Sequence, residues 1–167
     1  MALRHILTQE DSVLHKVCRE QVKFDERLHQ LLDDMAETLI AANGVGLAAP
    51  QVGILRRVVI VLETNVPEGE DEQVLELVNP TIVSSEGEQV GAEGCLSVPG
   101  EYGIVRRPMV VTVRAQDRDG NWYEYTGEGL TARCICHELD HLDGHLFTEK
   151  AERMLSEDEL MHPESEE

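Results

Sequence analysis

What this sequence lacks narrows its class before any motif is considered. Basic residues are scarce, with 14 Lys and Arg against 33 Asp and Glu, and the formal net charge is -19. An acidic surface repels phosphate, which disfavours nucleic-acid binding. No apolar run approaches the roughly 18 residues of a membrane span, and residues 1–18 carry charges where a secretory signal would be apolar. We therefore expect a cytoplasmic protein without a membrane partner.

Cysteine is sparse as well, and no internal repeat or linker divides the chain. A cytoplasmic protein keeps its thiols reduced, so core packing, metal binding or reactivity explains cysteines better than disulfides do. The four cysteines are Cys18, Cys95, Cys134 and Cys136, of which Cys18 is expected in the core. With 167 residues and 41% hydrophobic content, the sequence predicts a single domain spanning 1–167.

Helical periodicity is found toward the two ends of the chain. Asp25 is the expected N-cap of a helix over 25–42, where apolar residues recur at helical spacing. A second helix is predicted over 131–142 and a last short one over 151–160. We expect the final residues, 162–167, to form a frayed acidic tail.

Strand patterns lie between these helices. The segment 44–53 is dense in small residues and is expected to form a loop, and Asp119-Gly120 predicts a hairpin turn. The predicted strands cover 57–62, 75–83, 104–115 and 121–126. Strands in the middle with helices at both ends indicate an α+β fold rather than an alternating parallel sheet.

The stretch at 137–141 reads His-Glu-Leu-Asp-His and fits the pattern H-E-x-x-H. On a helix, His137 and His141 lie one turn apart, about 6 Å along the axis, and share a face. Both imidazoles can therefore reach one metal ion. Glu138 is adjacent but offset, so it can act on a water at that metal without being a ligand. The pattern indicates metal-assisted hydrolysis with Glu138 as general base; a solvated helix glutamate is the alternative.

Two histidines leave the third ligand open, and the downstream candidates are weak. One common continuation of the motif requires a histidine where this chain has Phe147, and His145 comes two residues too early. Another class of metallohydrolase takes a glutamate from a later helix. Glu152, Glu157 and Glu159 are available, but few residues remain to build a supporting domain.

Cys95 is the better candidate, because it lies between small and polar residues rather than in an apolar run. A thiolate binds zinc or ferrous iron strongly, and two histidines with one cysteine leave a position open for water. A small buried hydrophobe is the alternative reading of a lone cysteine. Cys134 has a side chain too short to reach a metal between the histidines, and we place it in the pocket lining. Cys136 is rotated about 100° from His137 and is expected in the core or behind the ligands.

Three motifs follow one another in the chain: GVGLAAPQ at 44–51, EGCLS at 93–97 and HELDH at 137–141. Together they resemble the signature motifs of bacterial-type peptide deformylases, and the resemblance extends to about Phe147. This family removes the formyl group from the N-terminal formylmethionine of newly synthesised proteins, releasing formate. The resemblance implies antiparallel strands packed around a central helix that carries the two histidines, with N-terminal helices and a short C-terminal helix.

The resemblance also implies roles for single residues. A ferrous ion would be held by Cys95, His137 and His141, with Glu138 as the catalytic acid and base. In the same way, Gln51 and the backbone N–H of Leu96 would stabilise the oxyanion, Gly46 would bind the peptide backbone, and Glu93 would pair with Arg107. An apolar pocket should accept the methionine side chain, and its expected lining is Val45, Leu96, Leu130 and Cys134.

This chain departs from the family pattern at two positions. Cys136 stands where glutamine is common, and Arg133 stands near the expected pocket mouth, where an apolar residue is also common. The short acidic tail disfavours docking on ribosomal RNA through a basic C-terminal helix. We expect a monomer whose partners are nascent N-formylmethionyl polypeptides.

Other readings remain open from the residues. A site of two histidines and a cysteine accepts Fe²⁺, Zn²⁺, Ni²⁺ or Co²⁺, and the sequence does not name the ion. A metallopeptidase of another class would use the same helix but has no good third ligand. An acidic binding module with a structural metal would need neither Glu138 nor Gln51.

Overall fold

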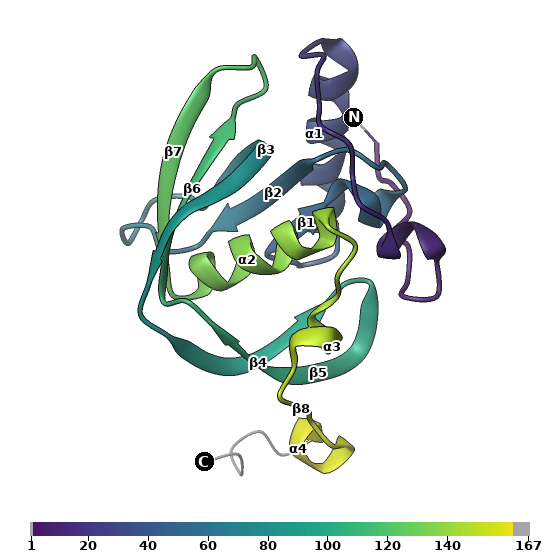
Figure 1. The fold of residues 1–167 in the computed structure, drawn as a ribbon, viewed down its shortest axis with the longest axis vertical. Coiled ribbons are helices and arrows are strands. Elements are labelled where there is room, and N and C mark those ends of the chain that lie inside the picture. The colour runs from purple at the N-terminus through teal and green to yellow at the C-terminus, as the bar shows by residue number, and fades with distance from the viewer. Residues whose placement is uncertain (1, 162–167) are drawn as a thin grey trace.

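The computed structural model describes residues 2–161, so the predicted tail at 162–167 lies outside the described part of the chain. Its strands form two antiparallel sheets, one with the order β1-β2-β3-β6-β7 and one with the order β4-β5-β8 (Figure 1). The helices are α1 (Glu26–Ala41), α2 (Leu130–Leu142), α3 (Phe147–Lys150) and α4 (Glu157–Met161), and the 3-10 turns are η1 (Ser12–His15) and η2 (Ala49–Val52). The strands are β1 (Gly46–Ala48), β2 (Val58–Glu63), β3 (Gln73–Glu86), β4 (Gln89–Cys95), β5 (Val98–Arg107), β6 (Val110–Gln116), β7 (Trp122–Glu128) and β8 (Arg153–Met154). The fold is α+β, as expected.

Helix α1 follows its sequence signals. Asp25 is the N-cap, and its Oδ1 accepts a hydrogen bond from the Leu28 N–H at 3.3 Å. The helix ends just before Asn43, whose φ of 56° leaves the helical region. Leu32, Met35 and Leu39 are fully buried on the side that packs against β2. The predicted helix is therefore confirmed to within a residue at each end.

Strand β2 is buried on both faces, which explains its unbroken apolar sequence. Val58 and Ile60 pack against α1, whereas Val59 and Val61 pack against α2. This follows from the alternation of side chains along a strand. Burying a side chain of this kind stabilises the fold by about 1.5–3 kcal/mol. The strand thus joins the two apolar cores, and Figure 1 shows α2 lying between the two sheets.

The predicted strand over 104–115 was wrong, because the structure divides it between the two sheets. β5 ends at Arg107 and β6 begins at Val110, with Pro108 between them. Proline has no N–H to donate to a ladder, so the chain leaves one sheet there and enters the other. Two apolar runs on either side of the proline resembled a single strand because a change of sheet leaves no periodic signal.

Three smaller corrections concern short elements. β4 was not predicted, since its sequence QVGAEGC holds two glycines and little β-branched character. The expected loop at 44–53 contains β1 and η2, and the expected helix at 151–160 is a two-residue strand followed by α4. Over residues 2–161, no helix combines the length and the apolar character required to cross a bilayer.

Candidate active site and metal centre

Three potential ligand atoms meet where α2 lies beside the end of β4. Cys95, His137 and His141 each present one such atom, and these atoms lie within 4.8 Å of one another. The Sγ of Cys95 is 3.4 Å from Nε2 of His141. The two imidazole rings are 5.1 Å apart between centroids, as one helical turn allows. Residues that are distant in sequence thus form one cluster.

A tight connection places Cys95 at this point. Cys95 pairs with Val98, so Leu96 and Ser97 alone turn the chain from β4 into β5. Just before the turn, the ring of Tyr102 lies against Gly94, where an added Cβ would be only 2.4 Å from a ring carbon. Only glycine at position 94 leaves room for this ring.

The second nitrogen of His137 is held by Glu93. Its Nδ1 lies 2.8 Å from Glu93 Oε1, which leaves Nε2 free to act as a metal ligand. Arg107 binds the same carboxylate through two hydrogen bonds of 2.8 and 3.0 Å, so the predicted Glu93–Arg107 pair is confirmed. Burial alone would raise the pKa of Glu93, but hydrogen bonds from Arg107 and His137 outweigh it and lower the pKa to about 2. The carboxylate is therefore ionised and orients the imidazole.

Glu138 is buried and its side chain lies against Gly46. A Cβ at Gly46 would lie 2.6 Å from Oε2 of Glu138, so only glycine leaves room for this carboxylate. Within residues 2–161, Oε1 of Glu138 finds no hydrogen-bond partner. Burial raises the pKa of Glu138 to about 7. A carboxyl of this kind can accept and return a proton near neutral pH.

Gln51 points into the same space from η2. Its Oε1 accepts a hydrogen bond from the Ala48 N–H at 2.9 Å, which fixes the orientation of the amide. Its Nε2 donates to Oγ of Ser97 at 3.0 Å and lies 3.6 Å from Sγ of Cys95. Ser97 is fully buried and was not predicted as a site residue. Its hydroxyl in the EGCLS motif was the only available signal.

A cavity of about 380 Å³ opens beside these groups. All residues expected to contact substrate line it, and they are Val45, Gly46, Leu96, Leu130 and Cys134. Gln51, Cys95, His137 and Glu138 border the same space, whereas His141 is not part of the lining. Burial raises the pKa of Cys134 to about 12, so this thiol remains protonated, in keeping with a lining residue. Cys18 and Cys136 are buried in the apolar core, as expected.

Arg133 lines this cavity, in keeping with its expected place near the pocket mouth. Its side chain is nevertheless only 8% exposed, and its Nη1 lies 2.7 Å from Oε2 of Glu93, a contact that was not predicted. Nothing in the sequence indicates this contact, because α2 and β4 are far apart along the chain.

The donor set fits a transition-metal ion. One thiol and two imidazoles form a soft to borderline site that leaves coordination positions free. Burial lowers the pKa of His141 to about 3, so its imidazole is neutral, which is the form that binds metals. The carboxylate of Glu138 next to the cluster has the placement required of a general base.

The sequence pattern of the polypeptide deformylase family matches residues 3–157. The chain belongs to this family. It is 56% identical over 155 residues to the peptide deformylase of Agathobacter rectalis, covering 93% of this chain and 94% of the relative. The peptide deformylase of Caldicellulosiruptor bescii is 54% identical over 160 residues, or 96% and 92% of the two chains. The crystal structure of a peptide deformylase from Legionella pneumophila superposes with a TM-score of 0.80 at 41% identity and covers 99% of each chain.

Similarity of this extent assigns the activity. The protein is a deformylase that removes the N-terminal formyl group from formylmethionyl peptides of newly synthesised proteins. Nascent formylmethionyl chains are therefore its substrates. The family consists of metalloenzymes, and Cys95, His137 and His141 form a possible metal site in this chain.

Proposed function

We propose that Cys95, His137 and His141 hold one ferrous ion and that Glu138 is the general acid and base of deformylation. The observation that carries this proposal is the convergence of three ligand atoms within 4.8 Å beside a buried carboxylate. When bound, the ion supplies Lewis acidity, which lowers the pKa of water to near neutrality. Zn²⁺, Ni²⁺ or Co²⁺ can take the same ligands.

Glu138 handles the proton in this scheme. Its carboxyl takes the proton as water attacks the formyl carbon, and then gives it to the leaving amine as formate departs. The pKa of about 7 suits both steps, since neither protonation state is strongly favoured at neutral pH. Gly46 leaves the space that the carboxylate occupies, and its backbone lies at the cavity edge, where it can bind the substrate peptide.

Gln51 and the backbone N–H of Leu96 stabilise the oxyanion that forms on the formyl oxygen. The Ala48 N–H holds the Gln51 amide so that Nε2 faces Cys95. Leu96 follows Cys95 directly in the turn, which keeps its N–H next to the ligand. Loss of one such donor typically costs about 3–4 kcal/mol of barrier.

The methionine side chain occupies the cavity lined by Val45, Leu96, Leu130 and Cys134. This lining is mostly apolar, which suits the thioether side chain of methionine. We further propose one catalytic domain over 1–167 in which the histidine helix is central, acting as a cytoplasmic monomer. A ribosome contact through a basic C-terminal helix is not part of this proposal.

Formate release tests the proposal most directly. The metal-free protein is reconstituted in separate samples with Fe²⁺ under anaerobic conditions, with Ni²⁺ and with Zn²⁺. Each sample is then assayed on a formyl-Met peptide and on its unformylated counterpart. We expect formate only from the formylated peptide and the fastest release with Fe²⁺. Internal cleavage of either peptide, or equal activity of Cys95→Ser at one bound metal per chain, would contradict the assignment.

A further inference from the structure

Arg133 occupies an unusual position for an arginine. It lies on α2 four residues before His137, so the two side chains share a face of the helix. The side chain is 8% exposed, yet it reaches the cavity that also contacts Leu130 and Cys134. A buried guanidinium requires hydrogen-bond partners. These partners identify what the residue does.

The principal partner is Glu93. Nη1 of Arg133 lies 2.7 Å from Oε2 of Glu93 and 3.1 Å from the carbonyl oxygen of Val105 on β5. The other oxygen of Glu93, Oε1, binds Nδ1 of His137. A continuous path of hydrogen bonds therefore runs from Arg133 through one carboxylate to a proposed metal ligand.

Arg107 does not make Arg133 redundant. Arg107 divides its donors between Glu93 and Asp140, with a bond of 2.8 Å to Asp140. Among the described residues 2–161, Glu93 is the one acid that binds Arg133, and Arg133 ties α2 to both β4 and β5. If Arg133 were lost, the bond left on Oε2 of Glu93 within this part of the chain would be the one from Arg107 Nε at 3.0 Å. The carboxylate could then rotate and take the His137 ring with it.

We propose that Arg133 is a positioning residue that fixes the His137 imidazole through Glu93, while its aliphatic stem forms part of the pocket wall. This inference rests on the proposed ligand set. It explains why this position holds a charged residue, although an apolar side chain would be sufficient to line the pocket. Groups directly behind a metal ligand typically contribute about 10–100-fold to metal affinity or activity. Arg133 acts one bond further away, so we expect the lower end of this range.

Arg133→Met separates the two roles, because methionine keeps an unbranched pocket wall and loses the guanidinium. We expect the Co²⁺ affinity, measured by competition with a chelator, to fall about tenfold. The visible ligand-field bands of the Co²⁺ protein should shift because the ligand geometry changes. On a formyl-Met peptide, kcat should fall about tenfold with little change in KM. Arg133→Lys keeps a charged donor near Glu93 and should lie between wild type and Arg133→Met in all three measurements.

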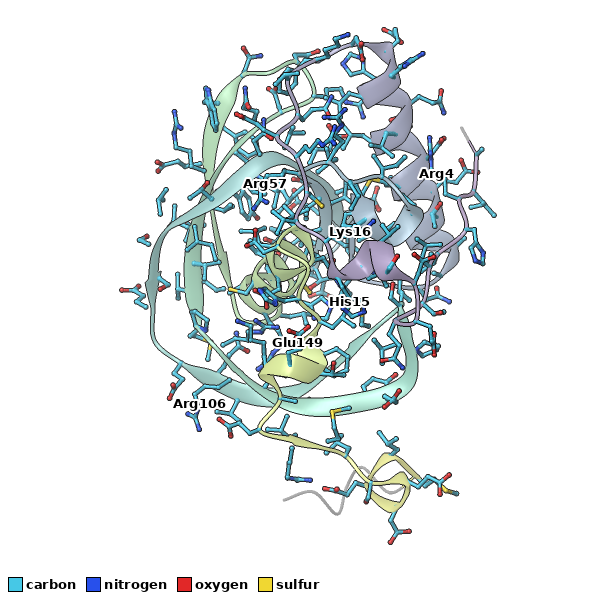
Figure 2. The ribbon with its side chains drawn as sticks, turned by 45° about the vertical axis from the view of Figure 1, so that its right-hand side comes forward. Arg4, His15, Lys16, Arg57, Arg106 and Glu149 are labelled. Carbon is cyan, nitrogen blue, oxygen red and sulfur yellow. The ribbon has the colours of Figure 1, made fainter. Side chains whose placement is uncertain are left out.

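Arg106 provides a matched control on the next strand position to Arg107. It also makes two ion pairs, to Glu88 and Glu152, but its side chain is 48% exposed and lies at the periphery of the molecule (Figure 2). Arg106→Met should therefore leave affinity, spectrum and kcat at wild-type values.

Wild-type affinity and an unshifted spectrum in folded Arg133→Met would overturn the inference, as would Arg133→Lys performing no better than Arg133→Met. If Arg133→Met does not fold, Arg133→Gln replaces it under the same criteria. A merely structural role would lower thermal stability without moving the Co²⁺ bands or kcat. If instead the wild-type protein bound no metal, or released no formate when loaded, the proposed function would fail, and this result is separate from the behaviour of the variants.

Discussion

The two faces of α2 are held in place by interactions of different kinds. One face carries Ala132, Ile135 and Leu142, which pack with β2 in an apolar core. The other carries Arg133 and His137, which bind a single buried carboxylate on β4. Apolar packing is non-directional, so the first face provides stability. Hydrogen bonds are directional, so the second face fixes the geometry of the proposed metal site.

This contrast means that substitutions on the two faces should have separable effects. Changes on the apolar face should lower the free energy of unfolding and leave turnover by the folded enzyme nearly intact. Changes on the polar face should reduce turnover more than stability.

Glu138→Gln should have the largest effect. The amide has the size of the carboxyl but cannot take a proton, so kcat should fall about 10²–10⁴-fold. Metal stoichiometry and the thermal midpoint should remain close to those of wild type, since Glu138 is not a proposed ligand. Steady-state kinetics beside metal analysis checks both points. Turnover at the wild-type rate in a correctly loaded Glu138→Gln protein would remove the general-base role.

Ile135→Ala tests the apolar face. Ile135 is fully buried in the core formed with β2, so the cavity left by the substitution should cost about 2–5 kcal/mol of unfolding free energy. Urea denaturation measures this loss. Formate release per folded molecule, assayed well below the new midpoint, should stay close to wild type. A drop in kcat as large as the one expected for Glu138→Gln would show that the two faces are not independent.

Gly46→Ala sharpens the comparison, because it adds one methyl group on β1 directly against the Glu138 carboxylate. The new Cβ would meet Oε2 of Glu138 at 2.6 Å, so the carboxylate must move. A misplacement of this size can cost about 100-fold in rate. Gly103→Ala is the matched control, since its Cβ would be similarly crowded but would meet Met154 and Ala151 instead of Glu138. Equal kinetics of the two variants would argue against the idea that Gly46 provides the space for the Glu138 carboxylate.

The smallest effect is expected at Glu63, which anchors the start of α2. Its Oε1 accepts a hydrogen bond from Oγ1 of Thr131 at 2.6 Å, and its Oε2 accepts one from the Tyr125 hydroxyl. Burial alone would raise the pKa of Glu63, but these bonds and one from the Asn65 N–H outweigh it and lower the pKa. The stabilisation is therefore present above the unfolded pKa, near 4.3, and is lost as the pH falls through the folded value.

Glu63→Gln should accordingly reduce the unfolding free energy by about 1–2 kcal/mol at pH 7. The difference from wild type should shrink as the pH falls below the unfolded value near 4.3 and through the lowered folded pKa. Urea denaturation at pH 7 and in this acidic range measures the change. A difference independent of pH would mean that the charge of Glu63 is not what stabilises the helix start.

Several elements were predictable because their signals are local. Asp25 and the apolar spacing after it located α1, and the H-E-x-x-H pattern located the two histidines on a helix. The division of 104–115 between two sheets was not predictable, since pairing partners are chosen by the whole chain. β4 was not predictable because its glycines lower the strand propensity of the segment. They are there to allow close contacts, such as that of Tyr102 with Gly94.

The sequence by itself determined the chemistry of this protein: which side chains can bind a metal, which can move a proton, and which family motifs carry them. Helical spacing even fixed the relation of His137 to His141, since that relation depends on one local period. Only the tertiary structure decided that Cys95 reaches the same point, that Gly46 gives Glu138 its space, and that Arg133 binds Glu93 beside the pocket. These contacts depend on the pairing of β4 with β5 and on how the sheets pack around α2. Both are set by residues far apart in the chain, and neither leaves a periodic pattern in the sequence.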